Sequence, residues 1–80
     1  MNRPLRSFVV FAFESTHAAL EAEDVLKAEG LAVVPIPTPA ALGSLCGLAM
    51  RVPPEQADRA RAALVDRGVL PCAETVIDDL

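Results

Sequence analysis

Periodic segments alternate along this 80-residue chain in the order strand, helix, strand, strand, helix, strand. The first strand is predicted over residues 7–13, SFVVFAF, because apolar residues occupy both of its faces. Ser15 is placed to cap a helix over residues 16–29, which Gly30 ends. A second strand is predicted over residues 31–36, and the prolines at its end indicate an edge position in a sheet.

The second half of the chain repeats this pattern after a loop from Pro37 to Leu45. A third strand is predicted over residues 46–52, because CGLAMRV alternates between two faces. The face predicted to meet the core carries Cys46, Leu48, Met50 and Val52. A second helix is predicted over residues 55–67, with Gly68 ending it, and a weaker fourth strand over residues 69–79.

The order βαββαβ predicts one α+β domain over residues 1–80, a ferredoxin-like two-layer sandwich. It would have a four-stranded antiparallel sheet, in the spatial order 4, 1, 3, 2, with two helices on one face. Because the first strand is apolar on both faces but helices would cover only one, we expect Val10 or its neighbours on the other face to be buried by a second copy or a partner. The protein is therefore predicted to be a homo-oligomer.

Composition excludes several classes of function. The net charge is −4 and Lys plus Arg total only 7, so nucleic acid is not expected as a ligand. Prolines and a glycine interrupt the apolar region 31–50, which therefore cannot cross a membrane as one helix. The apolar run after Arg3 and Arg6 is too short and too aromatic for a signal peptide, so we expect a cytoplasmic protein. In that compartment the two cysteines are expected to be free thiols.

Cys46 is the candidate reactive residue. In the predicted topology it lies at the sheet edge where the first helix begins, near Ser15, Thr16 and His17. A helix N-terminus carries unpaired N–H groups and partial positive charge, which favour a thiolate and lower the pKa of a thiol. His17 would add a positive charge or relay a proton, and Gly47 would leave room for a ligand. The alternative is an inert thiol packed in the core.

Cys72 is a possible second thiol. It begins the fourth strand at the same edge, but the first strand would separate it from Cys46. Two inter-strand spacings place the Cα atoms about 10 Å apart. A disulfide needs Cα atoms within about 7 Å, so none is expected in the resting fold.

The segments STHAALEAEDVLKAEG and VPIPTPAALGSLCGLAMR resemble the small selenium/sulfur (Se/S) carrier-like protein family. The resemblance rests on Pro37, Pro39, Leu42, Cys46 and Gly47, with support from Ala19, Leu20 and Glu23. The chain departs from the family pattern at Ala40, where a basic residue is frequent, and at Gly43, where a serine is frequent. Losing the basic residue removes a possible partner for an anion or a thiolate.

This resemblance implies a carrier that holds sulfur or selenium on Cys46 as a persulfide or selenyl sulfide. Its partners would be a donor such as a cysteine desulfurase and an acceptor protein. It implies no cofactor and no stand-alone enzyme activity. Two other functions stay open: a regulatory or ligand-binding module with an inert Cys46, and a metal-trafficking domain. The last is disfavoured because the two cysteines lack close CxxC-type spacing.

Overall fold

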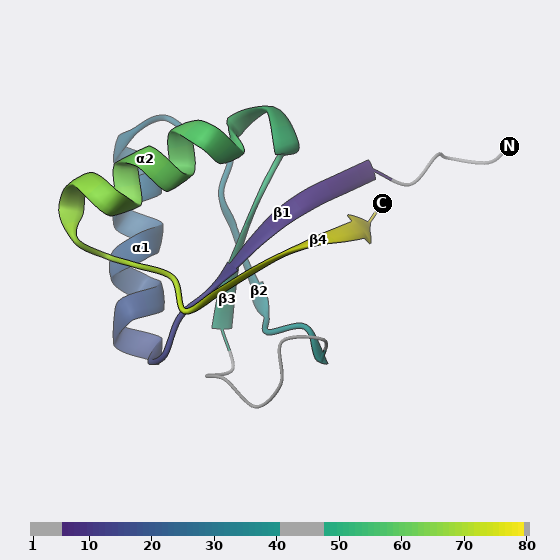
Figure 1. The fold of residues 1–80 in the computed structure, drawn as a ribbon, viewed down its shortest axis with the longest axis horizontal. Coiled ribbons are helices and arrows are strands. Elements are labelled where there is room, and N and C mark those ends of the chain that lie inside the picture. Colours follow the sequence, from purple (N-terminus) through teal and green to yellow (C-terminus); the bar gives the residue numbers. More distant parts are fainter. Residues whose placement is uncertain (1–5, 41–47, 80) are drawn as a thin grey trace, which may run out of the picture.

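The computed structural model describes residues 6–40 and 48–79. Four strands and two helices follow one another in the predicted order (Figure 1). The elements are β1 (Arg6–Ala12), α1 (Thr16–Ala28), β2 (Val34–Pro37), β3 (Leu48–Val52), the 3₁₀ turn η2 (Pro54–Gln56), α2 (Ala57–Arg67) and β4 (Ala73–Asp79). The strands and helices thus occur along the chain in the predicted order βαββαβ.

The four strands form one antiparallel sheet with the order β2-β3-β1-β4. This is the predicted order 4, 1, 3, 2 read from the opposite edge. Strand β2 lies at one edge, which confirms the inference from its prolines. Strand β1 is central, with β3 and β4 as its neighbours.

Both helices lie on the same side of the sheet, so the fold has two layers (Figure 1). Between the layers, side chains from β1, β3 and both helices form the main core. Its largest fully buried members are Phe11, Phe13, Leu26, Met50 and Leu64. In α2, small residues at helical spacing lie on the buried side, as the sequence predicted. The ferredoxin-like α+β class is therefore confirmed.

A second, smaller apolar cluster lies on the other face of the sheet. Val10, Ala12 and Ala49 are fully buried there, with Ile36 and Ile77 among the half-buried residues around them. Val10 is thus buried within a single chain. The premise that a second copy must cover Val10 is wrong, because Val10 is already fully buried in the single chain; the homo-oligomer itself stays a prediction.

The second strand begins later than predicted, at Val34 instead of residue 31. The reason is the way α1 ends. Gly30 adopts φ 75°, and the N–H groups of Gly30 and Leu31 donate to the carbonyls of Lys27 and Leu26 at 3.0 and 3.2 Å. This is a Schellman motif, in which the apolar residue after the glycine packs back on the helix. Leu31 is accordingly buried in the core but belongs to the helix cap.

The fourth strand likewise begins at Ala73 instead of residue 69. Gly68 has φ 71°, and Val69 N–H donates to the carbonyl of Leu64 at 2.9 Å. Val69 is buried against the core, as Leu31 is at the end of α1. The two helix ends therefore use the same motif, and in both cases the apolar residue after the glycine was wrongly assigned to a strand.

The remaining boundaries differ by small shifts. Strand β1 covers Arg6–Ala12 instead of residues 7–13, and α1 ends at Ala28 instead of residue 29. The second helix begins at Ala57 instead of residue 55, directly after the 3₁₀ turn Pro54–Gln56, and such turns are frequent at the starts of α-helices. None of the described helices is both long and apolar enough to cross a membrane.

Candidate functional site

One end of the sheet gathers four chain segments. Ala12, the last residue of β1, is the register partner of Ala49 in β3 and of Ala73 in β4. The helix α1 begins four residues after Ala12. The end of β1, the start of α1 and the starts of β3 and β4 therefore meet at the same end of the molecule (Figure 1). The sequence analysis assumed this arrangement when it placed the candidate site at the start of the first helix.

Ser15 caps α1 as predicted. Its backbone is extended, with φ −139° and ψ 157°, and its Oγ accepts a hydrogen bond from Ala18 N–H at 3.1 Å. The first intrahelical bond runs from Ala19 N–H to the Ser15 carbonyl at 3.0 Å. Within the described part of the chain, the N–H groups of Thr16 and His17 have no acceptor. With respect to the described residues, the first turn thus keeps the N–H groups of Thr16 and His17 as donors without an acceptor at this end of the sheet.

Thr16 and His17 are both exposed at the start of α1. The imidazole of His17 makes no hydrogen bond or ion pair with any described residue. No described residue therefore fixes the orientation of the imidazole, and the ring is able to turn toward a group bound near the start of α1.

Pro37 and Pro39 occupy different environments. Pro37 is the last residue of β2, where it pairs with Leu48 and is exposed. The prediction that Pro37 opens the loop is therefore wrong by one residue, since the strand extends through it. Pro39 follows the strand and is half-buried. Both lie close in sequence to the segment that leads to β3.

Cys46 and Gly47 lie outside the described residues. The structure fixes the strand that follows them, which begins at Leu48. Leu48, Met50 and Val52 face the main core, as predicted for this strand. Ala49 and Arg51 lie on the other face, where Arg51 stacks over the Phe8 ring at 4.1 Å from its centroid.

Cys72 is a free and exposed thiol just before β4. Its backbone N–H donates to the carbonyl of Ala12 at 2.9 Å, and its Sγ lies 3.5 Å from the same oxygen. Ala73, the next residue, is the register partner of Ala12. The two contacts with Ala12 thus follow directly on the β1–β4 ladder and hold Cys72 at the predicted end of the sheet.

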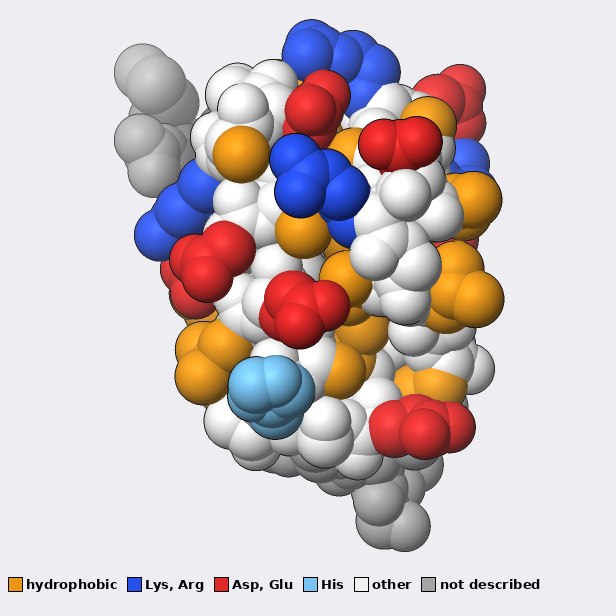
Figure 2. Space-filling model, turned by 90° about the vertical axis from the view of Figure 1, so that its left-hand side faces the viewer, with side chains coloured by type: hydrophobic (Ala, Val, Ile, Leu, Met, Phe, Trp, Pro, Cys, Tyr) orange, Lys and Arg blue, Asp and Glu red, His pale blue; other side chains and the backbone are white. Residues whose placement is uncertain are grey.

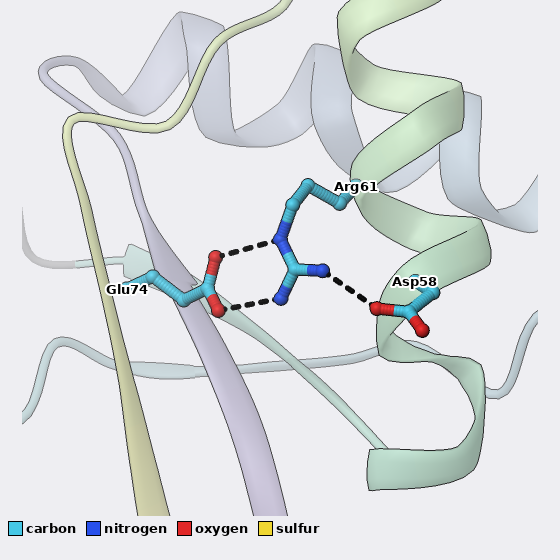
Figure 3. A network of polar contacts seen from close by, with 3 residues as sticks. All are labelled: Asp58, Arg61 and Glu74. Atoms are coloured by element: carbon cyan, nitrogen blue, oxygen red, sulfur yellow. Dashed lines mark hydrogen bonds and ion pairs between the residues drawn. The ribbon is translucent and has the colours of Figure 1, made fainter.

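A network around Arg61 was missed by the sequence analysis. From α2, Arg61 makes two hydrogen bonds to the Glu74 carboxylate in β4, at 2.6 and 3.1 Å, and one to Asp58 at 2.8 Å (Figure 3). The bond to Glu74, and then that to Asp58, raises the pKa of the Arg61 guanidinium. Arg61 also lies 5.9 Å from the centroid of Phe11. The i, i+3 spacing of Asp58 and Arg61 on a helix indicates this ion pair from the sequence. The pairing with Glu74 could not be found in that way, because Glu74 lies on a separate strand, 13 residues further along the chain.

Among the described residues, open hollows lie on the helical face, and the two described next contain no residue predicted for the site. One, of about 390 Å³, lies between α1 and α2; the other, of about 490 Å³, lies along α2. The first is lined by Val25, Glu29, Arg59, Ala62, Ala63, Asp66 and Arg67. Acidic and basic side chains are interspersed on this face, with apolar ones between them (Figure 2). Such a mixture favours neither anions nor cations.

Metal binding has no support among the described residues. They contain no group of three His, Cys, Asp or Glu side chains placed to hold an ion. Among the described residues, the sheet end offers the thiol of Cys72, the imidazole of His17 and the N–H groups at the start of α1.

Comparison with protein families gives one match. Residues 8–73 match the family described as "Putative Se/S carrier protein-like". The chain belongs to this Se/S carrier-like family. The matched segment runs from the first strand to the start of the last and includes both cysteines, the cap of α1 and the proline-rich segment. The searches of curated proteins and of solved structures each found no significant match.

Proposed function

We propose that this chain takes up a sulfur or selenium atom on Cys46 and passes it to an acceptor protein. The observation that carries the proposal is the family match, which covers Cys46 together with the elements on both sides of it. Family membership supports a Se/S carrier in general, and the assignment of Cys46 as the carrying residue is our inference.

The arrangement of the described elements supports this assignment. Only Gly47 separates Cys46 from Leu48, so the covalent chain keeps the Cα atoms of Cys46 and Leu48 within about 7 Å. Leu48 begins β3 at the end of the sheet where α1 also begins. The free N–H groups of Thr16 and His17 lie at that end. Donors of this kind stabilise a thiolate relative to a thiol.

The transfer is an exchange between sulfur atoms. The Cys46 thiolate attacks the terminal sulfur of a donor persulfide, the bond between that sulfur and the donor cysteine breaks, and the donor leaves as a thiolate. Cys46 then carries the persulfide, and the terminal sulfur moves to an acceptor nucleophile by the same step. With a donor-bound selenyl sulfide, the terminal selenium moves in the same way. No external oxidant or reductant is needed, because the transferred atom keeps its oxidation state.

The partners follow from this chemistry. A donor must present a sulfane sulfur, as a cysteine desulfurase does, and the acceptor must offer a nucleophile. In this scheme the chain works as a carrier between two proteins, because the donor and the acceptor are both separate molecules.

The test is mass spectrometry after loading. The protein is incubated with a cysteine desulfurase and cysteine, without reductant, and then digested under conditions that preserve persulfides. We expect a gain of about 32 Da on the peptide that contains Cys46. The Cys46→Ser variant should take up nothing, and the Cys72→Ser variant should load as the native chain does.

Three results would overturn the proposal: no loading of a folded protein, equal loading of Cys46→Ser, or loading confined to Cys72. In the first case, the alternative of a binding module with an inert Cys46 is favoured.

A further inference from the structure

The two edges of the sheet differ in how well they could accept another strand. At one edge, β2 carries Pro35 and Pro37 among its four residues. Proline has no N–H to donate, so this edge is blocked as a template for pairing. At the other edge, β4 is seven residues long, contains no proline and pairs only with β1 among the described strands. The free edge of the sheet is therefore that of β4.

The side chains of β4 form two different rows. Glu74, Val76 and Asp78 lie on the helix side, while Ala73, Thr75 and Ile77 lie on the side of the smaller cluster. Val76 is 63% exposed at the centre of the strand, although it lies on the same side as the main core. An exposed β-branched residue in the middle of an edge strand is a contact that another strand can cover.

Two carboxylates are fixed on either side of Val76. Glu74 is held by Arg61, and Asp78 accepts a hydrogen bond from Ser7 Oγ at 3.0 Å. Both positions are therefore preorganised, with an apolar contact between them. The row reads acid, valine, acid along one side of the free edge.

The charge around this edge is negative. Glu74 and Asp78 belong to β4, and Asp58 lies beside Arg61. Among the described side chains of this edge, these three acids stand against one arginine, Arg61. A strand with basic residues at both ends and an apolar residue between them would complement this row.

From these observations we propose that the β4 edge binds an extended, basic segment of a partner protein by strand addition. Main-chain hydrogen bonds to β4 would supply the affinity, and the acid–valine–acid row would supply the specificity. This inference concerns a partner surface and does not depend on the chemistry of Cys46.

A second copy of this chain fits the edge less well. If two β4 strands paired antiparallel about Val76, Glu74 of one copy would lie opposite Asp78 of the other. Like charges directly opposite one another destabilise a strand pair. The same acids that attract a basic strand therefore oppose self-pairing here.

The probe is a capped heptapeptide, Thr-Lys-Val-Val-Thr-Lys-Thr. Antiparallel to β4, it places lysines opposite Asp78 and Glu74 and a valine opposite Val76. Two control peptides are used. In one, glutamates replace both lysines; in the other, proline replaces the central valine, which keeps the charge but prevents continuous strand pairing.

Binding is followed by amide NMR titration of the full-length Cys46→Ser variant, so that thiol chemistry does not interfere. We expect shifts and slower amide exchange confined to residues 73–79, with weaker binding as salt is raised. Both control peptides should bind at least about fivefold more weakly, because one has the wrong charge and the other cannot pair.

Two protein variants form a matched pair. Val76→Lys adds a positive charge at the centre of the edge, and Val65→Lys adds the same charge on α2, at a residue that is 60% exposed against 63% for Val76. Because both sites are exposed, both variants should stay folded, as circular dichroism would show. Peptide binding should weaken about fivefold in Val76→Lys and remain within about twofold in Val65→Lys.

Equal binding of the proline and parent peptides would show charge attraction without strand addition and would overturn the proposal. It would also be overturned by shifts that map outside β4, by equal effects of the two lysine variants, or by self-association through β4. Loss of persulfide loading has no bearing on these readouts, so the two proposals can fail separately.

Discussion

Cys72 contacts Ala12 twice: both its N–H and its Sγ lie within hydrogen-bonding distance of the same carbonyl oxygen, at 2.9 and 3.5 Å. The backbone bond positions the residue, and the thiol adds a weaker contact. Ala12 is the last residue of β1, which is an inner strand of the sheet. These two contacts therefore hold Cys72 against the end of β1. Its place is set by the main chain and does not depend on sulfur.

Replacing Cys72 with Ser should therefore leave the fold intact. A hydroxyl can donate to the Ala12 carbonyl as the thiol does, and the backbone bond is unchanged. We expect the free energy of unfolding to change by less than about 0.5 kcal/mol. Urea unfolding followed by circular dichroism measures it. A loss above about 2 kcal/mol would mean that sulfur contributes a contact beyond those seen around Ala12.

The cap of α1 is expected to contribute measurably to stability. In Ser15→Ala, the N–H of Ala18 loses its side-chain acceptor, and the free energy of unfolding should fall by about 1 kcal/mol. Thr16→Ala is the matched control, because it removes a neighbouring exposed hydroxyl that accepts no cap bond. Comparable losses in both variants would contradict the capping role of Ser15.

Burial separates two leucines of the same helix. Leu26 is fully buried in the main core, whereas Leu20 is 48% exposed. Leu26→Ala should lower the free energy of unfolding by about 2 to 5 kcal/mol, enough to unfold much of so small a domain. Leu20→Ala should cost less than about 1 kcal/mol. Chemical denaturation of the two variants side by side tests this, and similar losses would contradict the packing described for α1.

The arrangement of elements could be predicted because the strongest local signals agree with the final structure. Ser15 caps a helix by a local bond, and the two glycines end helices with a left-handed conformation that other residues avoid. The prolines of β2 excluded it from the centre of the sheet. Each of these signals acts within a few residues, so sequence alone is enough to find it.

The errors arise where local and distant contacts compete. Leu31 and Val69 look like strand residues, but each packs back on the helix before it. From the sequence, Val10 is expected to need a partner to cover it, but it is fully buried within the single chain. The Arg61–Glu74 pair joins α2 to a distant strand, and no spacing along the chain predicts that register.

Within the site, the sequence placed Ser15, Thr16, His17 and Cys72 correctly at one end of the sheet. That placement followed from topology alone. The Cα separation of about 10 Å between the two cysteines stays a prediction, although Ala49 and Ala73, which pair with opposite sides of Ala12, support two strand spacings between β3 and β4.

Self-association also stays a prediction, on the same face of the sheet but through the residues around Val10. Ile36 and Ile77 are only half-buried on the face away from the helices, and Val34 on that face is 40% exposed. We expect a homo-oligomer by sedimentation at high micromolar concentration. Val34→Lys should weaken it and Val65→Lys on α2 should not. A native chain that sediments as a monomer at that concentration contradicts this expectation.

The reactivity of Cys46 tests the link between fold and proposed chemistry. If the free N–H groups at the start of α1 act on this thiol, its pKa should lie below the usual value of about 8.5. The rate of iodoacetamide alkylation, measured against pH in the Cys72→Ser variant, gives that pKa directly. The pKa is expected to fall because N–H donors stabilise the thiolate, so the thiol loses its proton at lower pH. The alkylation rate should therefore rise at a lower pH than for an ordinary thiol.

The contribution of His17 is measured in the same way. In His17→Ala the imidazole is removed but the helix N–H groups remain, so the pKa of Cys46 should rise only if His17 lies close to the sulfur. Glu21→Ala, which alters an exposed residue of the same helix, controls for changes in α1. Reaction of Cys46 only after denaturation, or with an unshifted pKa, would favour the inert core thiol and would remove the chemical basis of the proposed carrier.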